Sequence, residues 1–363
     1  MSCFITRTGA YLPGAAVENE QIERFLGRLE GEAAIKDQIL EANGIRLRHY
    51  AQDQFQQPTE DVYQLAARAV ADCLGHENDH MPVTFLSAGS TYAPLSGPGF
   101  GSILHSRTAH LPQLNHPVEI SSHGGICTSS AAAIVAAVRA IECGSHATAL
   151  CVGAEHSSEV LKSNTMQPAD DRGLHSDVRH SQWFMSVFLR FMLSDGAGAF
   201  LLQQQPSPKG LSLAVDWTHS QSMANETPLC MKLENSSRLL SQDVRILNRH
   251  LFPAAEKFVR SAFETHCERL SSYHVVLPHL SSFFFRRKME RMLDKLSSNG
   301  APTVPYWTNL ATVGNTGSAS IYIMLNRYLQ ENSLRHGDRI LLFIPESGQF
   351  NFVLISLTAT VAE

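Results

Sequence analysis

The sequence predicts an α/β protein made of two similar halves, with buried helices packed between sheets. Residues 147–153 form a continuous apolar run, which is typical of a strand covered on both faces. An extended run at 117–121 leads through a glycine turn into an alanine- and valine-rich helix. Residues 314–320 lead into a helix at a comparable place later in the chain. This repetition indicates a duplicated α/β unit with two central helices between sheets.

The first half is expected to cover residues 1–205. A Pro-Gly pair ends its opening strand at 5–11, and Asn19 can cap a helix at 20–26. Apolar residues at helical spacing predict a second helix that runs from 59 to 73. The stretch 163–182 is polar and too long for a simple connection. The other expected elements are strands at 83–87, 117–121 and 147–153 and helices at 98–107 and after Cys127.

The second half, 206–363, begins at a Pro-Ser-Pro segment and repeats the pattern of the first. Apolar runs predict its strands, and apolar residues at helical spacing predict its helices. The expected elements, in order, are a strand at 211–216, a helix at 243–266, a strand at 274–278, helices at 281–297 and 317–330, and strands at 339–344 and 351–357.

Composition excludes several functional classes. Of 363 residues, 44% are hydrophobic and 17% are charged, which suits a globular protein with a sizeable core. The net charge of -5 gives no general reason to bind nucleic acid. We expect neither a signal peptide nor a membrane span, since no run of about 18 apolar residues occurs. Seven widely spaced cysteines without a CxxC pair argue against a disulfide framework and a zinc site, and favour the cytoplasm.

Cys127 is the residue around which we expect the chemistry to be organised. Gly124 and Gly125 permit a sharp turn before it, so that it lies near the N-terminus of a buried helix. Unpaired N–H groups and the helix dipole there favour a thiolate. The backbone N–H of Cys127 can also bind an oxyanion. The alternative is an unreactive core cysteine, because free cysteine is often buried.

Three other positions accompany this cysteine. His279 follows an apolar strand, at the strand end where ligands bind in open α/β sheets, although a structural histidine is the alternative. Asn315 lies between two glycines and is either a turn residue or a functional amide. Gly348 separates the last two strands, as a hairpin turn or as a second oxyanion donor. Asp195 is expected to be structural.

A basic cluster follows His279 on the next predicted helix. Such charge runs are commonly solvated faces, and the alternative is a docking patch for an acidic carrier protein. The cluster consists of Arg286, Arg287, Lys288 and Arg291.

Taken in order, the motifs resemble the ketoacyl synthase III branch of the thiolase superfamily. They are Gly-Gly-Ile-Cys127-Thr-Ser-Ser, Leu193-Ser-Asp-Gly-Ala-Gly-Ala, Leu277-Pro-His279, Gly314-Asn315-Thr-Gly-Ser-Ala-Ser and the Gly348 loop. The resemblance implies the thiolase fold, a five-layered αβαβα arrangement of two duplicated halves, and a homodimer. It implies a catalytic triad of Cys127, His279 and Asn315, and an oxyanion hole from the backbone N–H groups of Cys127 and Gly348. It implies no metal and no cofactor, with acyl-CoA or acyl carrier protein thioesters as substrates.

The chain departs from the family pattern after the histidine. It continues with Leu280-Ser-Ser in place of Gln-Ala-Asn, and a Phe-Phe-Phe tripeptide at 283–285 suggests an altered entrance. The glycine-rich segment 95–100 suggests a reshaped acyl pocket. The opening motif at 11–19 and His123-Gly-Gly-Ile-Cys127 look similar to the ketosynthase/cyclases of the DarB and StlD type. Those enzymes join two thioesters into cyclohexanediones on the way to dialkylresorcinols and stilbenes.

We therefore expect an acyltransferase-type condensing enzyme that forms a C–C bond by Claisen condensation, in secondary metabolism and with cyclisation in the DarB and StlD interpretation. One alternative is an acyltransferase on the same fold that passes the acyl group to an O or N nucleophile. Another is a non-catalytic partner subunit of a heterodimeric synthase, which the complete triad disfavours. A papain-type hydrolase is disfavoured by the arrangement of the cysteine and histidine. No motif predicts a nucleotide site. Acyl chain lengths and the choice between CoA and carrier remain open.

Overall fold

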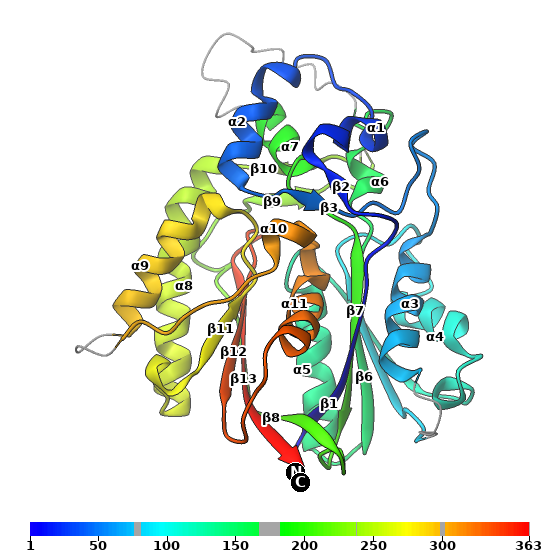
Figure 1. The fold of residues 1–363 in the computed structure, drawn as a ribbon, viewed down its shortest axis with the longest axis vertical. Coiled ribbons are helices and arrows are strands. Elements are labelled where there is room, and N and C mark those ends of the chain that lie inside the picture. The colour runs from blue at the N-terminus through cyan, green and yellow to red at the C-terminus, as the bar shows by residue number, and fades with distance from the viewer. Residues whose placement is uncertain (76–80, 167–181, 237, 298–301, 363) are drawn as a thin grey trace.

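The computed structural model of the chain describes residues 1–75, 81–166, 182–236, 238–297 and 302–362 (Figure 1). In this part of the chain a nine-stranded sheet follows the order β11-β12-β13-β8-β1-β7-β6-β4-β5. Its strands are β1 (Phe4–Tyr11), β4 (Phe85–Ser90), β5 (Glu119–Gly124), β6 (Thr148–Glu155), β7 (Gly196–Gln203), β8 (Gly210–Ser222), β11 (Val275–Pro278), β12 (Arg339–Pro345) and β13 (Asn351–Ala362).

The sheet has two parts that meet at the pairing of β1 with β8. Phe4 and Ile5 pair there with Ala214 and Leu213. On one side of this junction β4 runs parallel to both β5 and β6, and on the other side β11 runs parallel to β12. The carboxyl ends of these parallel strands lie toward the same region of the molecule, the usual place for a ligand site.

Helices cover both parts of the sheet and fill the space between them (Figure 1). The central pair comprises α5 (Ser129–Glu142) and α11 (Ser320–Glu331). One outer layer contains α3 (Val62–Leu74) and α4 (Phe100–Thr108), and the other contains α8 (Val244–His266) and α9 (Arg286–Leu296). The order helix, sheet, helix, sheet, helix is the five-layered αβαβα arrangement expected from the sequence.

The buried side chain of Tyr322 on α11 connects the two central helices and β7. The Tyr322 hydroxyl on α11 donates a hydrogen bond of 2.8 Å to the Ser130 carbonyl on α5. Its ring lies 4.4 Å from that of Phe200 on β7. A Cβ at Gly198, on the same strand, would lie only 2.3 Å from the Tyr322 Cβ. Glycine is therefore required where β7 passes under α11.

A cap of short elements lies above the layers (Figure 1). The buried Arg190 guanidinium joins its parts, since it pairs with Glu32 at 3.1 Å and donates to the carbonyls of Leu26, Gly27 and Leu161. Burial of this cation is tolerated because its donors are matched by acceptors. The cap contains α1 (Ile22–Leu26), α2 (Ala33–Asn43), α6 (Ser158–Leu161), α7 (Gln182–Arg190), β2 (Val17–Glu18), β3 (Leu47–Arg48), β9 (Met231–Leu233) and β10 (Leu240–Gln242).

Most predicted strands and helices of the layers are confirmed within a few residues at their ends. The strands β8 and β13 extend several residues beyond their expected ends, and α9 begins at Arg286 rather than at 281. The helices α2 and α7 were not predicted. Most of the irregular stretch expected at 163–182 lies outside the described residues. The division of the chain at 205 and 206 stays a prediction. No helix in the described ranges is long and apolar enough to cross a membrane.

Candidate active site

The structure places Cys127, His279 and Asn315 around one cavity. Cys127 follows β5, His279 follows β11, and Asn315 precedes α11. These three points meet because β5 and β11 end in the same region of the molecule, where the central helices begin. The predicted residues of the triad, separated by up to 188 positions in the sequence, therefore share one site.

The cavity walls beyond these polar residues are mainly apolar. A thioester with an alkyl chain suits such a lining, because the few polar groups gather at one place. Much of the apolar lining comes from α7, α8, α9, the β9–β10 hairpin and the segments that follow α7 and precede α9: Phe188, Leu189, Met192, Leu193, Met231, Leu233, Leu240, Leu247, Leu251, Phe252, Ala255, Leu280, Phe285 and Met289.

Cys127 is buried. It directly precedes Thr128, the N-cap residue of α5. A carboxylate already occupies this helix end. The backbone N–H of Thr128 donates to Glu346 Oε2 at 3.1 Å, and its hydroxyl donates to the same oxygen at 2.5 Å. The Asn351 amide holds the other oxygen, Oε1, at 2.9 Å. Glu346 therefore takes the anion-binding position that the helix dipole creates.

This arrangement corrects the expected ionisation of the cysteine. Burial raises the pKa of the Cys127 thiol well above its ordinary value, and the nearby carboxylates of Glu346 and Glu155 raise it further. The sequence-based expectation of a stabilised thiolate is therefore wrong. The reason is that the helix end is compensated by Glu346 and that desolvation penalises the anion.

His279 is held by its backbone, and its ring is left free. Its N–H donates to the Phe343 carbonyl at 2.8 Å, which extends the β11–β12 pairing by one residue. The buried ring has no hydrogen-bond partner on either nitrogen among the described residues. Burial lowers the pKa of His279 to about 4, so the imidazole is neutral at neutral pH. A buried polar group without a protein partner is suited to bind a ligand.

Asn315 has a defined amide orientation. Its Oδ1 accepts the Gly317 N–H at 3.0 Å, and its backbone bonds to Met192 and Ser194 on either side. Because the oxygen is engaged as an acceptor, the Nδ2 group is left to donate toward the cavity. Neutral His279 and Asn315 thus line one cavity, and each has a side-chain N–H group with no described protein acceptor.

Gly348 lies in the hairpin between β12 and β13, as predicted. Its carbonyl accepts from the N–H groups of Cys230 and Met231 at 2.9 and 3.1 Å. The Gly348 Cα lies against Ile126, the residue before Cys127. In the structure Ser347 lines the cavity, whereas Gly348 lines an adjoining hollow with Ile126. Its role as an oxyanion donor stays a prediction.

The basic cluster lies on α9, whose opposite side contributes Met289 to the cavity. Arg286 pairs with Glu290 at 2.9 Å, and Lys288 donates to Asn248 at 2.9 Å. Arg291 Nε bonds only to the Arg287 carbonyl among the described residues, at 3.1 Å. The structure thus places Arg286, Arg287, Lys288 and Arg291 on one helix next to the cavity wall.

The sequence-based reasoning missed Glu155. It ends β6, at the same sheet edge as Cys127, and it lines the cavity. Its Oε1 accepts from both the N–H and the hydroxyl of Thr91, at 3.0 and 2.6 Å, and from both groups of Ser318, at 3.2 and 2.5 Å. Burial raises the pKa of Glu155 to about 7 despite these hydrogen bonds. The available signal was an acidic residue directly after an apolar strand.

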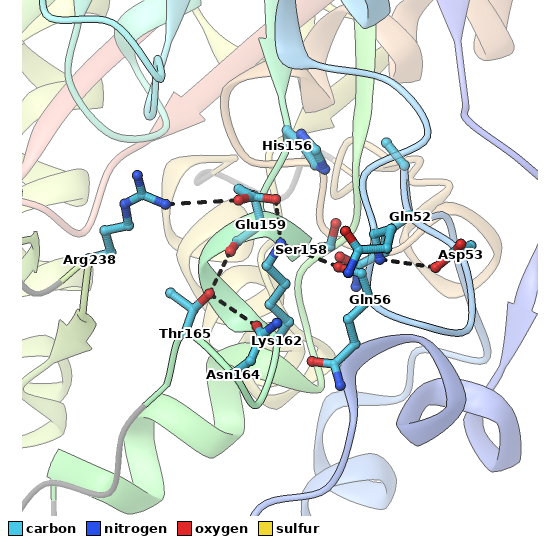
Figure 2. A network of polar contacts seen from close by, with 12 residues as sticks. Gln52, Asp53, Gln56, His156, Ser158, Glu159, Lys162, Asn164, Thr165 and Arg238 are labelled. Atoms are coloured by element: carbon cyan, nitrogen blue, oxygen red, sulfur yellow. Dashed lines mark hydrogen bonds and ion pairs between the residues drawn. The ribbon is translucent and has the colours of Figure 1, made fainter.

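Hydrogen bonds and ion pairs connect α6 with the neighbouring segments of the chain (Figure 2). Glu159 accepts from Lys162 at 2.8 Å and lies 3.9 Å from Arg238. The Arg238 guanidinium lies 6.0 Å from the ring centre of Tyr92, a residue of the cavity wall. Ser158, at the start of α6, donates to Asp195 from its backbone and its hydroxyl. Asp195 is thus structural, as expected.

Comparisons with known proteins agree with this geometry. Residues 271–345, which include His279 and Asn315, match the family model for the C-terminal part of 3-oxoacyl-[acyl-carrier-protein] synthase III. The fold is similar to FabH, 3-oxoacyl-(acyl carrier protein) synthase III of Pseudomonas aeruginosa PAO1, with a TM-score of 0.72, 20% identity, and coverage of 99% of this chain and 98% of the other.

Two further solved structures have the same fold. A single-residue variant of OleA from Xanthomonas campestris matches with a TM-score of 0.76 at 17% identity, over 99% of this chain and 98% of the other. AbyA1, described as a tetronic acid condensing enzyme, matches with a TM-score of 0.72 at 18% identity, over 98% and 99%. The overall architecture is therefore that of these synthases over nearly the full length of each chain.

Proposed function

We propose that this chain, a ketoacyl synthase III-like member of the thiolase superfamily, condenses two acyl thioesters through an acyl-enzyme on Cys127. The observation that carries the proposal is the meeting of Cys127, His279 and Asn315 in one cavity whose walls are mainly apolar. A nucleophile, two neutral donors and an apolar wall are what a Claisen condensation of acyl thioesters requires.

In the first step, the Cys127 sulfur attacks the carbonyl carbon of an acyl thioester as the thiol gives up its proton. The backbone N–H groups of Cys127 and Gly348 stabilise the tetrahedral oxyanion, each donor lowering the barrier by about 3 kcal/mol. CoA or the carrier thiol leaves with a proton, and the acyl group remains on Cys127. The apolar lining binds its alkyl chain.

In the second step, a second thioester binds with its carbonyl oxygen between the His279 ring and Asn315 Nδ2. The second thioester becomes an enolate by losing an α-proton or, if it carries a β-carboxylate, by losing carbon dioxide, and the hydrogen bonds that both groups donate strengthen as the enolate forms. Neutral His279 suits this role because its ring can donate a hydrogen bond without carrying a positive charge. A positively charged ring would also bind a carboxylate of the substrate before the reaction. The enolate carbon then attacks the Cys127 thioester, which forms the C–C bond and releases the cysteine.

The substrates and assembly belong to the same proposal. Arg286, Arg287, Lys288 and Arg291 would dock an acidic carrier protein, since they lie on the helix that also forms the cavity wall. Acyl-CoA is the alternative donor, and the chain would act as a homodimer without metal or cofactor. Ring closure to a cyclohexanedione in secondary metabolism extends the proposal, on the basis of the DarB- and StlD-like motifs around Cys127 and at 11–19.

Intact-protein mass spectrometry after mixing with a panel of acyl-CoA and acyl-carrier thioesters tests the first step. Wild type is expected to gain one acyl group, and Cys127→Ala is expected to gain none. Cys143→Ala is the matched control, because Cys143 is exposed and a hydrogen bond with Ser145 lowers its pKa, so it is a competing site of unspecific acylation. Acylation that disappears in Cys143→Ala and persists in Cys127→Ala would contradict the proposal.

A further inference from the structure

Glu155 is a buried carboxyl of the cavity that the two steps above do not use. One oxygen, Oε1, accepts all four hydrogen bonds from Thr91 and Ser318. No described residue donates to the other oxygen, Oε2, although the side chain is buried and lines the same cavity as Cys127. The carboxyl group is thus fixed on one side and open on the other.

Two other polar side chains at the site, His279 and Glu346, are less suited to accept a proton from a ligand. His279 is too weak a base, because burial lowers its pKa to about 4. Glu346 has both oxygens engaged, by Thr128 and by Asn351. Glu155 differs from both, since burial raises its pKa to about 7, near the value at which a general base works best.

The hydrogen bonds also relate Glu155 to the enolate-binding donors. Ser318, which bonds to Oε1, lies three residues after Asn315 in the same loop. Gly317, whose N–H orients the Asn315 amide, lies against the Glu155 side chain. A thioester whose oxygen is bound by Asn315 and His279 has its α-carbon one bond away from that carbonyl. Asn315, His279 and Glu155 line the same cavity, so the α-carbon of such a thioester would lie in the cavity that Glu155 also lines.

We propose that Glu155 is the base that removes the α-proton of the second thioester, so that the donor needs no β-carboxylate to lose. This inference rests on the proposed condensation and specifies its donor: an acyl or β-ketoacyl thioester that reacts by deprotonation. The donor's class thereby differs from that of a malonyl-type thioester, which would form the same enolate by losing carbon dioxide.

The step balances without another reactant. The Cα–H bond breaks, its proton passes to Glu155 Oε2, and its electron pair forms the enolate. The enolate carbon forms the new C–C bond to the acyl carbon on Cys127, and the C–S bond to Cys127 breaks. The departing thiolate takes the proton from Glu155, which restores the carboxylate and the thiol. The high pKa of Cys127 makes that return favourable.

Exchange of α-deuterium into water tests this role independently of bond formation. A donor thioester carrying two α-deuterons is incubated with Cys127→Ala, which cannot be acylated, and the loss of deuterium is followed by mass spectrometry. Cys127→Ala is expected to catalyse the exchange. Adding Glu155→Gln, which keeps an acceptor for Thr91 and Ser318, is expected to slow it by about 10²- to 10⁴-fold.

The control is Glu159→Gln in the Cys127→Ala background. Glu159 lies on α6 and accepts a hydrogen bond from Lys162 (Figure 2). It is not among the residues that line the cavity, so its replacement should leave the exchange rate unchanged. Glu155→Asp, which retains a carboxylate on a shorter side chain, should retain part of the exchange. Acylation of Cys127 in the single variant Glu155→Gln checks that the site is folded.

The inference and the proposed function fail in different ways. Exchange that is equally fast with Glu155→Gln, or wild type that condenses only β-carboxylated donors, would overturn the role of Glu155 while leaving condensation intact. Wild type that is acylated and condenses no donor at all would contradict the proposed function, and the exchange rates would still decide whether Glu155 removes the proton.

Discussion

At the scale of single residues, the site is organised around neutral forms. The Cys127 thiol has a raised pKa and His279 a lowered one, so the pair does not rest as thiolate and imidazolium. A helix N-terminus in a sequence is therefore insufficient to predict a reactive thiolate. Glu346 directly follows β12, 218 positions away from Thr128, and the sequence contains no local signal that it binds there.

Glu346→Gln should make the cysteine more reactive. The amide oxygen can keep accepting from Thr128, while the NH2 group replaces the oxygen that accepts from Asn351, and the change removes the negative charge that raises the pKa of Cys127. Each unit by which the thiol pKa falls increases the thiolate fraction at pH 7.5 about tenfold. We expect the alkylation of Cys127 by iodoacetamide to accelerate about 3- to 30-fold, measured by mass spectrometry of the Cys127 peptide. An unchanged rate would contradict the charge argument.

His279 should make stability depend on pH. Its pKa is about 4 in the folded protein and about 6.5 when unfolded, so the unfolded chain binds the proton more tightly. The stability associated with neutral His279 is present above pH 6.5 and is lost as pH falls toward 4. This loss amounts to at most about 3 kcal/mol.

Urea unfolding of wild type and His279→Gln at several pH values between 7 and 4 measures this contribution. Wild type should lose stability relative to the variant as pH falls, because glutamine does not titrate. The difference between the two proteins isolates His279 from Glu155, whose raised pKa has the opposite effect. Parallel curves for the two proteins would show that His279 is not buried as a neutral ring.

At the scale of elements, the long apolar runs were predictable and the short ones were not. Periodicity and strand composition identified the layers, including α5 and α11, because burial against a sheet requires those patterns. The short cap elements β9, β10 and α7 depend on packing against one another and against α8, which a local pattern does not show. Glu155 was missed for a related reason: its partners, Thr91 and Ser318, come from distant loops.

Gly198→Ala should destabilise the protein through this packing. The added methyl would lie 2.3 Å from the Tyr322 Cβ, which belongs to the rigid start of a buried side chain on α11. Overpacking of this kind typically costs about 1–3 kcal/mol. Thermal unfolding should show a clear decrease in the melting temperature. The control Gly97→Ala meets no atom within 4 Å and should have little effect; equal melting temperatures for both variants would contradict the packing argument.

Charge reversal on α9 tests carrier docking. Arg287→Glu combined with Arg291→Glu should raise the KM for an acyl-carrier donor about tenfold or more and leave acyl-CoA kinetics nearly unchanged. Lys295→Glu is the control. Lys295 lies further along the same helix, outside the basic cluster, and donates a hydrogen bond to Glu256 on α8. Equal effects on carrier and CoA donors would argue that the cluster is a solvated face, the commoner use of surface charge.

At the scale of the whole molecule, the site exists only where the two parts of the sheet and the cap meet. Cys127 comes from one part of the chain, His279 and Asn315 come from another, and the cap closes the apolar cavity around them. The ordered motifs predicted the fold and the meeting of these three residues. The cavity's shape, its apolar lining and its second carboxyl required the three-dimensional structure.

Identification of the released product tests the central claim most directly. Wild type, acylated on Cys127 with an isotopically labelled acyl group, is mixed with a second thioester, and the products are analysed by mass spectrometry with fragmentation. The account predicts a β-keto product in which the labelled carbonyl carbon is bonded to the α-carbon of the second substrate, and none from Cys127→Ala. A labelled ester, amide or free acid as the main product would contradict it.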